Sequence, residues 1–63
     1  MEYKVETAGD NEVQAAFAKL SERVNAAIRQ GWQPIGGVNT VYEGTKIDER
    51  PFIYAIQALT KGQ

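Results

Sequence analysis

The sequence contains few side chains that could carry out catalysis. It has no histidine and no cysteine, so it lacks an imidazole base, a thiolate nucleophile and the usual ligands of a structural zinc ion. Its one serine, Ser21, falls inside a predicted helix, and the adjacent acids Asp48 and Glu49 fall in a predicted loop, where such pairs are usually solvated. Gly36–Gly37 lacks the spacing of a phosphate-binding loop. We therefore expect a protein that is not an enzyme and that uses no metal or cofactor.

Residues suited to binding are more frequent than residues suited to catalysis. Backbone amides at a glycine pair could hold an anion, aromatic rings could stack on a ligand, and an arginine could supply charge. Each of these residues also has a structural alternative: a plug at a helix end, a strand bulge, a core aromatic or a solvated cation. The predicted ligand-binding residues are Trp32, Gly36, Gly37, Tyr42, Arg50 and Tyr54.

The length of 63 residues predicts one small domain, residues 1–63. A domain of this size buries only about 60% of the surface that its unfolded chain exposes and is marginally stable alone. Disulfides are excluded because cysteine is absent, so a partner subunit is the common remaining support. We expect a homo-oligomer, either a dimer or a dimer of dimers.

The charged residues nearly balance, with seven Lys and Arg against eight Asp and Glu. This balance argues against nucleic acid as a partner, because nucleic-acid binding depends on a basic surface. No apolar segment follows Met1, so we expect no signal peptide, and the sequence has no run of about 18 apolar residues. We expect a cytoplasmic protein with no membrane contact.

An amphipathic helix is the strongest local prediction. Its apolar residues recur at spacings of three and four, which places them on one stripe; they are Val13, Phe17, Leu20, Val24 and Ile28, flanked by Ala16 and Ala27. Asn11 and Gln14 fit a capping box at its start, and Asp10 is an alternative cap. Gly31 supplies the left-handed residue that ends a helix, and Trp32 is placed to pack back on its last turn.

One predicted strand precedes this helix in the sequence, and two follow it. Polar and apolar residues alternate over Glu2–Thr7, which predicts a half-buried strand. In the second strand, Trp32–Tyr42, Pro34 predicts an edge position and the glycine pair predicts a bulge or a close approach by a ligand. The third strand, Pro51–Leu59, is the most apolar and suits the centre of a sheet.

The order strand, helix, strand, strand predicts an α+β fold. Either the first strand lies beside the second, as a parallel neighbour, or the third strand lies between them. The apolar third strand and the edge proline favour the second arrangement. The predicted fold is therefore β-α-β-β, a three-stranded antiparallel sheet of order 1-3-2 with the helix packed on one face.

The third strand is apolar on both faces, although one helix covers only one face of a sheet. Leaving two large apolar side chains in water forgoes roughly 1.5–3 kcal/mol each. The strand residues predicted to face a second subunit are Ile53, Ala55, Gln57 and Leu59. The alternative is that scattered exposed apolar residues are ordinary. On the first strand, the charged residues Glu2, Lys4 and Glu6 would share this face and make the contact partial.

Several short motifs resemble a family of bacterial and phage proteins known as domain of unknown function 1737. They are the opening "EYKVET", Val24–Asn25 followed by Ile28, the central "GWQPIGG" and the closing "IQALTK". The resemblance covers nearly the whole chain, but the loop 43–50 is longer and more charged than the family pattern. It implies an α+β fold and no established activity.

Two functions from different classes remain. One is an oligomeric binding protein with a pocket between subunits near Gly36, Gly37 and the loop 43–50, which could sequester a nucleotide-like or other anionic ligand. For a phage protein, sequestering a signal of the host would suit a chain without catalytic groups. The alternative is a structural or adaptor protein that docks another protein through its apolar sheet face or edge strand.

Overall fold

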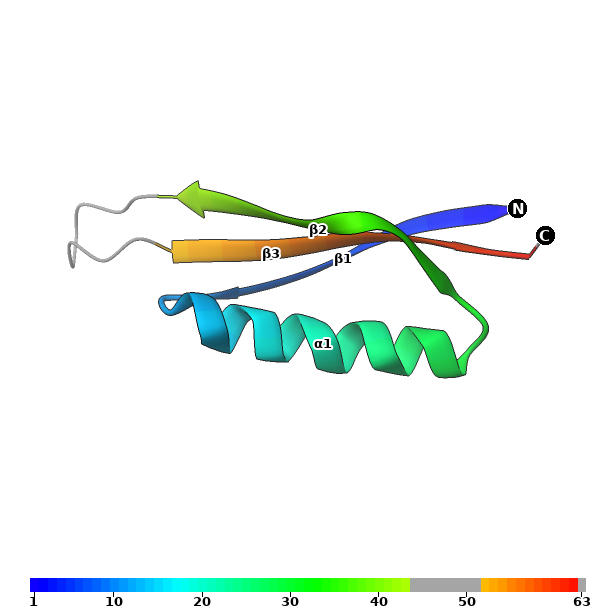
Figure 1. Ribbon diagram of the computed structural model, residues 1–63, viewed down its shortest axis with the longest axis horizontal. Coiled ribbons are helices and arrows are strands. Elements are labelled where there is room, and N and C mark those ends of the chain that lie inside the picture. The colour runs from blue at the N-terminus through cyan, green and yellow to red at the C-terminus, as the bar shows by residue number, and fades with distance from the viewer. Residues whose placement is uncertain (44–51, 63) are drawn as a thin grey trace.

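The computed structural model describes residues 1–43 and 52–62. The element order is β1 (Glu2–Asp10), α1 (Val13–Arg29), β2 (Gln33–Glu43) and β3 (Phe52–Lys61). Figure 1 shows the helix lying along one side of a three-stranded sheet, with the two chain ends at the same end of that sheet. The molecule is elongated, with principal extents of 44 × 17 × 16 Å. The predicted β-α-β-β fold is confirmed.

The sheet has the order β1-β3-β2, and both pairs of neighbours are antiparallel. The β1–β3 pairing is continuous from Glu2 opposite Lys61 to Asp10 opposite Ile53. The predicted central position of β3 is therefore confirmed, as is the edge position of the strand that carries Pro34. A proline is tolerated there because an edge strand has amides that need no ladder partner.

Helix α1 begins differently from the sequence prediction. Its N-cap is Glu12, and no side chain caps it, so the predicted box of Asn11 and Gln14 is wrong. Asp10, the alternative cap, instead binds the N-cap residue itself: its Oδ1 accepts a hydrogen bond from the Glu12 amide at 3.1 Å. This is a turn closed by an aspartate side chain two residues upstream, a common local structure for that residue.

The helix ends in a Schellman motif, as the sequence predicted. The Trp32 amide donates to the Ala27 carbonyl at 3.1 Å, and the Gly31 amide donates to the Ile28 carbonyl at 3.0 Å. Gly31 has a φ of 99°, a left-handed conformation that costs a glycine little and other residues more. At this C-terminal end of α1 the chain turns and enters β2.

The helix covers the opposite face of β3 from the one predicted. Ile53, Ala55, Gln57 and Leu59 are at most 5% exposed within the single chain. The core joins Ala55 to Ala8 of β1 and to Ala16 and Leu20 of α1, with Val24 packed against it. The assignment of Ile53, Ala55, Gln57 and Leu59 to a subunit interface is therefore wrong, because α1 already occupies that face.

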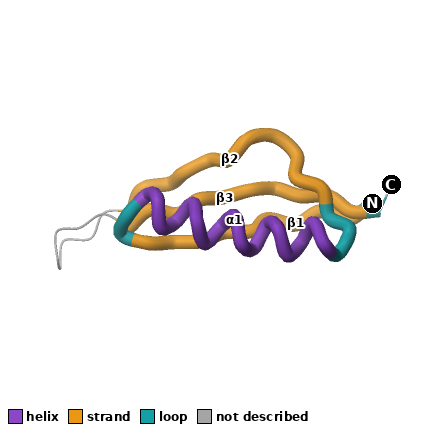
Figure 2. Tube along the Cα trace, turned by 60° about the horizontal axis from the view of Figure 1, so that its bottom comes forward, coloured by secondary structure: helices purple, strands orange, loops and turns teal. Residues whose placement is uncertain are grey.

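Small side chains explain why the helix packs on this face. Three of the four residues in the core cluster are alanines, which let the helix backbone approach the sheet closely. The helix lies mainly over β1 and β3, as Figure 2 shows, and every residue of β2 is exposed. Among the described residues, no helix has the length and apolar character needed to cross a membrane.

Candidate functional site

The face of the sheet opposite α1, which we call the open face, is the most distinctive surface of the molecule. Its side chains come from alternate residues of each strand, because paired residues in an antiparallel sheet point to the same side. The register places Val5 opposite Ala58, Thr7 opposite Ile56, and Val41 opposite Tyr54 on this face. The described members of the open face are Tyr3, Val5, Thr7, Gly9, Gln33, Ile35, Asn39, Val41, Glu43, Phe52, Tyr54, Ile56, Ala58 and Thr60.

The open face is apolar and largely uncharged. Tyr3 is 64% exposed, Val5 47% and Val41 48%. Val41 lies opposite the half-buried Tyr54, Val5 lies opposite Ala58, and Tyr3 lies further along the face, opposite Thr60. Glu43, at one end, is the one member with a carboxylate. A second apolar face therefore exists, as predicted. On the central strand it consists of Phe52, Tyr54, Ile56 and Ala58, and not of the residues that were predicted to face a second subunit.

Two aromatic rings lie together at one end of the open face. The rings of Phe52 and Tyr54 meet edge to face, with centroids 5.1 Å apart. Gly9 is paired with Tyr54, and a Cβ built on Gly9 would lie 2.5 Å from the Phe52 ring. The absence of a side chain at Gly9 is therefore what allows these rings to lean over the edge strand.

A shallow depression of about 620 Å³ lies beside these rings on the open face. Its lining residues are Thr7, Val41, Tyr42, Glu43, Tyr54 and Ile56. The lining offers apolar side chains with hydroxyl groups and one carboxylate, so it suits an apolar or neutral group better than an anion.

The predicted bulge at the glycine pair is present in β2. Ile35 pairs with Ala58 and Asn39 pairs with Ile56, so residues 36–38 stand opposite the single residue Gln57. Gly36 adopts a φ of 72°. The Gln57 Nε2 atom donates to the carbonyl oxygens of Ile35 at 3.0 Å and Ala58 at 2.9 Å, and lies 3.4 Å from that of Gly36. The buried amide of Gln57 thus satisfies carbonyl groups that the bulge removes from the ladder.

The structure does not bring the predicted ligand-binding residues together within one chain. Trp32 lies at the end of α1, where the Lys4 Nζ is 4.6 Å and the Lys61 Nζ is 5.5 Å from its ring centroid. Tyr42 falls in register with Ile53 on the helix side of β2, whereas Tyr54 is on the open face. Gly36 and Gly37 form the bulge, and Arg50 lies outside the described residues.

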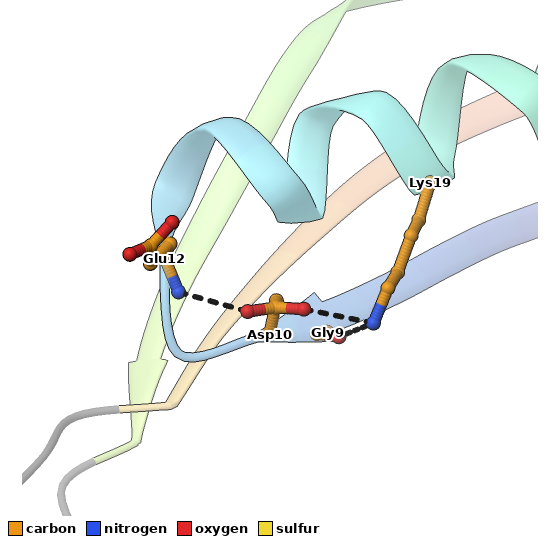
Figure 3. A network of polar contacts seen from close by, with 4 residues as sticks. All are labelled: Gly9, Asp10, Glu12 and Lys19. Carbon is orange, nitrogen blue, oxygen red and sulfur yellow. Dashed lines mark hydrogen bonds and ion pairs between the residues drawn. The ribbon is translucent and has the colours of Figure 1, made fainter.

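The outer edge of β1 is held by side chains of the helix. Lys19 Nζ forms an ion pair with Asp10 Oδ2 at 2.8 Å and donates to the Gly9 carbonyl at 3.3 Å, as Figure 3 shows. One turn later, Arg23 donates to the Thr7 carbonyl. The hydrogen bond from Lys19 and the one from the Glu12 amide hold the pKa of Asp10 below its ordinary value.

Sequence reasoning missed the identity of the open face and the role of Gln57. The alanines at positions 8, 16 and 55 were an available signal for the first, since small residues mark a close approach of helix and sheet. Lys4 and Glu6 misled the interpretation, because charges were expected on the solvent side. In the structure both lie on the helix side and form an ion pair at 3.0 Å, and the Lys4 Nζ also lies over the ring of Trp32.

Comparison with known protein families identifies the family to which the chain belongs. The family described as domain of unknown function (DUF1737) matches residues 3–62. No curated protein and no solved structure matches the chain. Among the described residues, no group of three or more acidic side chains is placed to hold a metal ion.

Proposed function

Because the chain belongs to the DUF1737 family, whose function is unknown, we propose from its geometry that it is a non-enzymatic interaction protein working as a homo-oligomer. The observation that supports this function is the open face, which carries an apolar surface on the central strand of the sheet. Tyr3, Val5 and Val41 of this face are each about half exposed or more. In this proposal the open face packs on the same face of a second copy.

The size of the open face is adequate for association. Strands of nine to eleven residues at about 3.4 Å per residue and about 4.8 Å between strands give a flat area of roughly 400 Å². The largest apolar patches on monomers cover about 300–600 Å² and are often functional. With side-chain relief included, two such faces would together bury close to the roughly 1,000 Å² that a specific interface needs.

The charge of the open face favours a second copy over a strongly charged partner. Glu43 is its one described carboxylate, and it carries no lysine or arginine, so two copies would meet with little repulsion.

Native mass spectrometry of protein purified from cells tests this function. The proposal predicts an assembly whose mass is a multiple of 7.0 kDa and that carries no small adduct. Thermal melting across a panel of nucleotides and metabolites should show no shift. A monomer at high micromolar concentration would contradict the proposal.

A ligand held between subunits is the second candidate function. The depression beside Tyr54 and Ile56 favours it, since association through the open face would enclose this space. The Glu43 carboxylate in its lining disfavours an anion there. A copurifying adduct in the native mass spectrum, lost in a Tyr54→Ala variant, would support this candidate over pure association. For either function we place the protein in the cytoplasm, where a chain without cysteine needs no disulfide.

A further inference from the structure

The two edges of the sheet are treated differently by the rest of the chain. An unpaired strand edge can pair with another chain, and soluble proteins usually block it with charged or covering groups. The edge of β1 is blocked, because Lys19 and Arg23 donate to the carbonyls of Gly9 and Thr7. The same strand also carries four charged side chains, those of Glu2, Lys4, Glu6 and Asp10.

Among the residues that the structure describes, none protects the edge of β2 in this way. All eleven of its residues are exposed, and residues 33–42 include no charged side chain. Within the described part of the chain, the side-chain hydrogen bonds to β2 come from Gln57, on the inner side next to β3. After the bulge, the segment 39–43 resumes regular pairing with β3 and so presents a regular outer edge.

The helix side of β2 is also left partly uncovered. A depression of about 210 Å³ lies between α1 and β2, lined by Phe17, Leu20, Ser21 and Val38. Phe17 is 40% exposed, Val38 49% and Tyr42 67%, although all three lie on or beside the face that α1 covers elsewhere. The open face does not account for these exposed side chains, because they lie on the other side of the sheet.

We propose that β2 pairs antiparallel with β2 of a second copy about a twofold axis at Thr40. This register sets Thr40 opposite its own copy and Val38 opposite Tyr42 of the second copy, on the helix side of the sheet. It creates an aromatic pair with a β-branched residue, a favourable cross-strand combination. The Tyr42 ring of the second copy then reaches over Val38 of the first toward Phe17 and fills the depression between α1 and β2. Glu43 stays outside the paired segment.

This edge interface is independent of the proposed association through the open face. A twofold axis perpendicular to the sheet keeps both helices on one side and joins the two open faces into a single six-stranded surface. The two interfaces together would give a dimer of dimers with closed symmetry. Either interface could exist without the other, so the experiment must separate them.

Cysteine crosslinking separates the two interfaces, because the chain has no cysteine of its own. Residues directly opposite each other in an antiparallel pair have Cβ atoms about 4.5–5.5 Å apart, close to the spacing that a disulfide spans. We expect Thr40→Cys to form a covalent dimer under mild oxidation while keeping its circular dichroism spectrum. The matched control is Glu6→Cys, on the blocked strand but on the helix side of the sheet, which lies outside both interfaces and should stay mostly monomeric.

A second pair of variants tests the register. In the Thr40→Cys background, Val38→Lys should slow crosslinking about fivefold by placing charge against Tyr42 of the second copy. Ile28→Lys, a substitution on α1 at a residue with a similar exposed fraction but outside both interfaces, should leave the rate within about twofold. Crosslinking of Thr40→Cys no faster than that of Glu6→Cys would overturn the edge interface. Preferential crosslinking of Glu6→Cys would overturn it too.

Discussion

The side-chain amide of Gln57 lies 3.0 Å from the carbonyl oxygen of Ile35 and so closes the gap that the bulge opens between β2 and β3. Gln57 is 5% exposed and is the one buried polar residue among those that the structure describes. In the sequence it interrupts an apolar strand. In the fold it supplies the hydrogen-bond donors that a bulged strand would otherwise lack.

Replacing Gln57 should therefore destabilise the fold although the substitute is apolar. Gln57→Leu removes the donor from buried carbonyls, and we expect a loss of about 1–3 kcal/mol in the free energy of unfolding. Urea denaturation measures it. The control is Gln14→Leu, an exposed glutamine on α1, which should change stability by less than about 0.5 kcal/mol. Equal effects of the two substitutions would argue against the role given to Gln57.

The glycine pair of the bulge should respond asymmetrically to alanine. A Cβ would meet nothing within 4 Å at either position, but only Gly36 has a positive φ, of 72°. Gly36→Ala should cost about 1 kcal/mol for the left-handed backbone. Gly37→Ala should be neutral or stabilise by up to about 1 kcal/mol. Thermal or urea unfolding of the two variants provides the comparison, and equal losses would mean that something other than the backbone angle matters there.

Gly9 should be intolerant of a side chain for a steric reason. Gly9→Ala would press a methyl group against the rings of Phe52 and Tyr54, at 2.5 and 3.0 Å before any adjustment. We expect a loss of about 1–3 kcal/mol in the free energy of unfolding, typical of overpacking. Adding Phe52→Leu should recover part of that loss, because the two residues are in contact. Strictly additive effects of the two substitutions would contradict the proposed contact.

Asp10 should make the stability dependent on pH in the acid range. Its pKa is lowered in the fold, chiefly by the hydrogen bond from Lys19 and then by the Glu12 amide. A lowered pKa means that the contribution is present above the unfolded value of about 3.9 and is lost as pH falls through the folded value. Asp10→Asn should thus be less stable than the native chain at pH 6, and the difference should shrink toward pH 2.

Lys19→Gln provides the control for this titration. In its background the loss of stability caused by Asp10→Asn should be smaller at pH 6, because the first cause of the lowered pKa has been removed. Urea denaturation from pH 2 to pH 7 measures the substitution in both backgrounds. A pH dependence unchanged by Lys19→Gln would show that the lysine is not the partner that matters.

The order of the strands and the course of the helix could be predicted from the sequence, but the choice of face could not. Pro34 and the apolar third strand predicted the order, and the stripe from Val13 to Ile28 predicted the helix. Because Phe52–Leu59 is apolar on both sides, hydrophobicity alone does not say which side α1 covers. The alanines at positions 8, 16 and 55 decide it through close packing.

The sequence predicted that an uncovered apolar face would exist, but it did not predict which residues form it. That one face of the sheet would remain apolar and uncovered followed from counting one helix against two apolar faces. The sequence did not predict that Trp32, Tyr42 and Tyr54 lie apart, because their positions depend on strand register and on the Schellman turn at Gly31. The link between Gln57 and the bulge likewise requires the pairing of β2 with β3.

Sedimentation equilibrium on a matched pair of isoleucine variants tests the central claim most directly. Ile35 on the open face and Ile28 on α1 are each 44% exposed, so Ile35→Lys and Ile28→Lys place the same charge at equally exposed sites on opposite sides. We predict that the native chain and Ile28→Lys sediment as multiples of 7.0 kDa at tens of micromolar, and that Ile35→Lys has a lower average mass. A native chain that sediments as a monomer, or equal loss of mass in both variants, would contradict association through the open face.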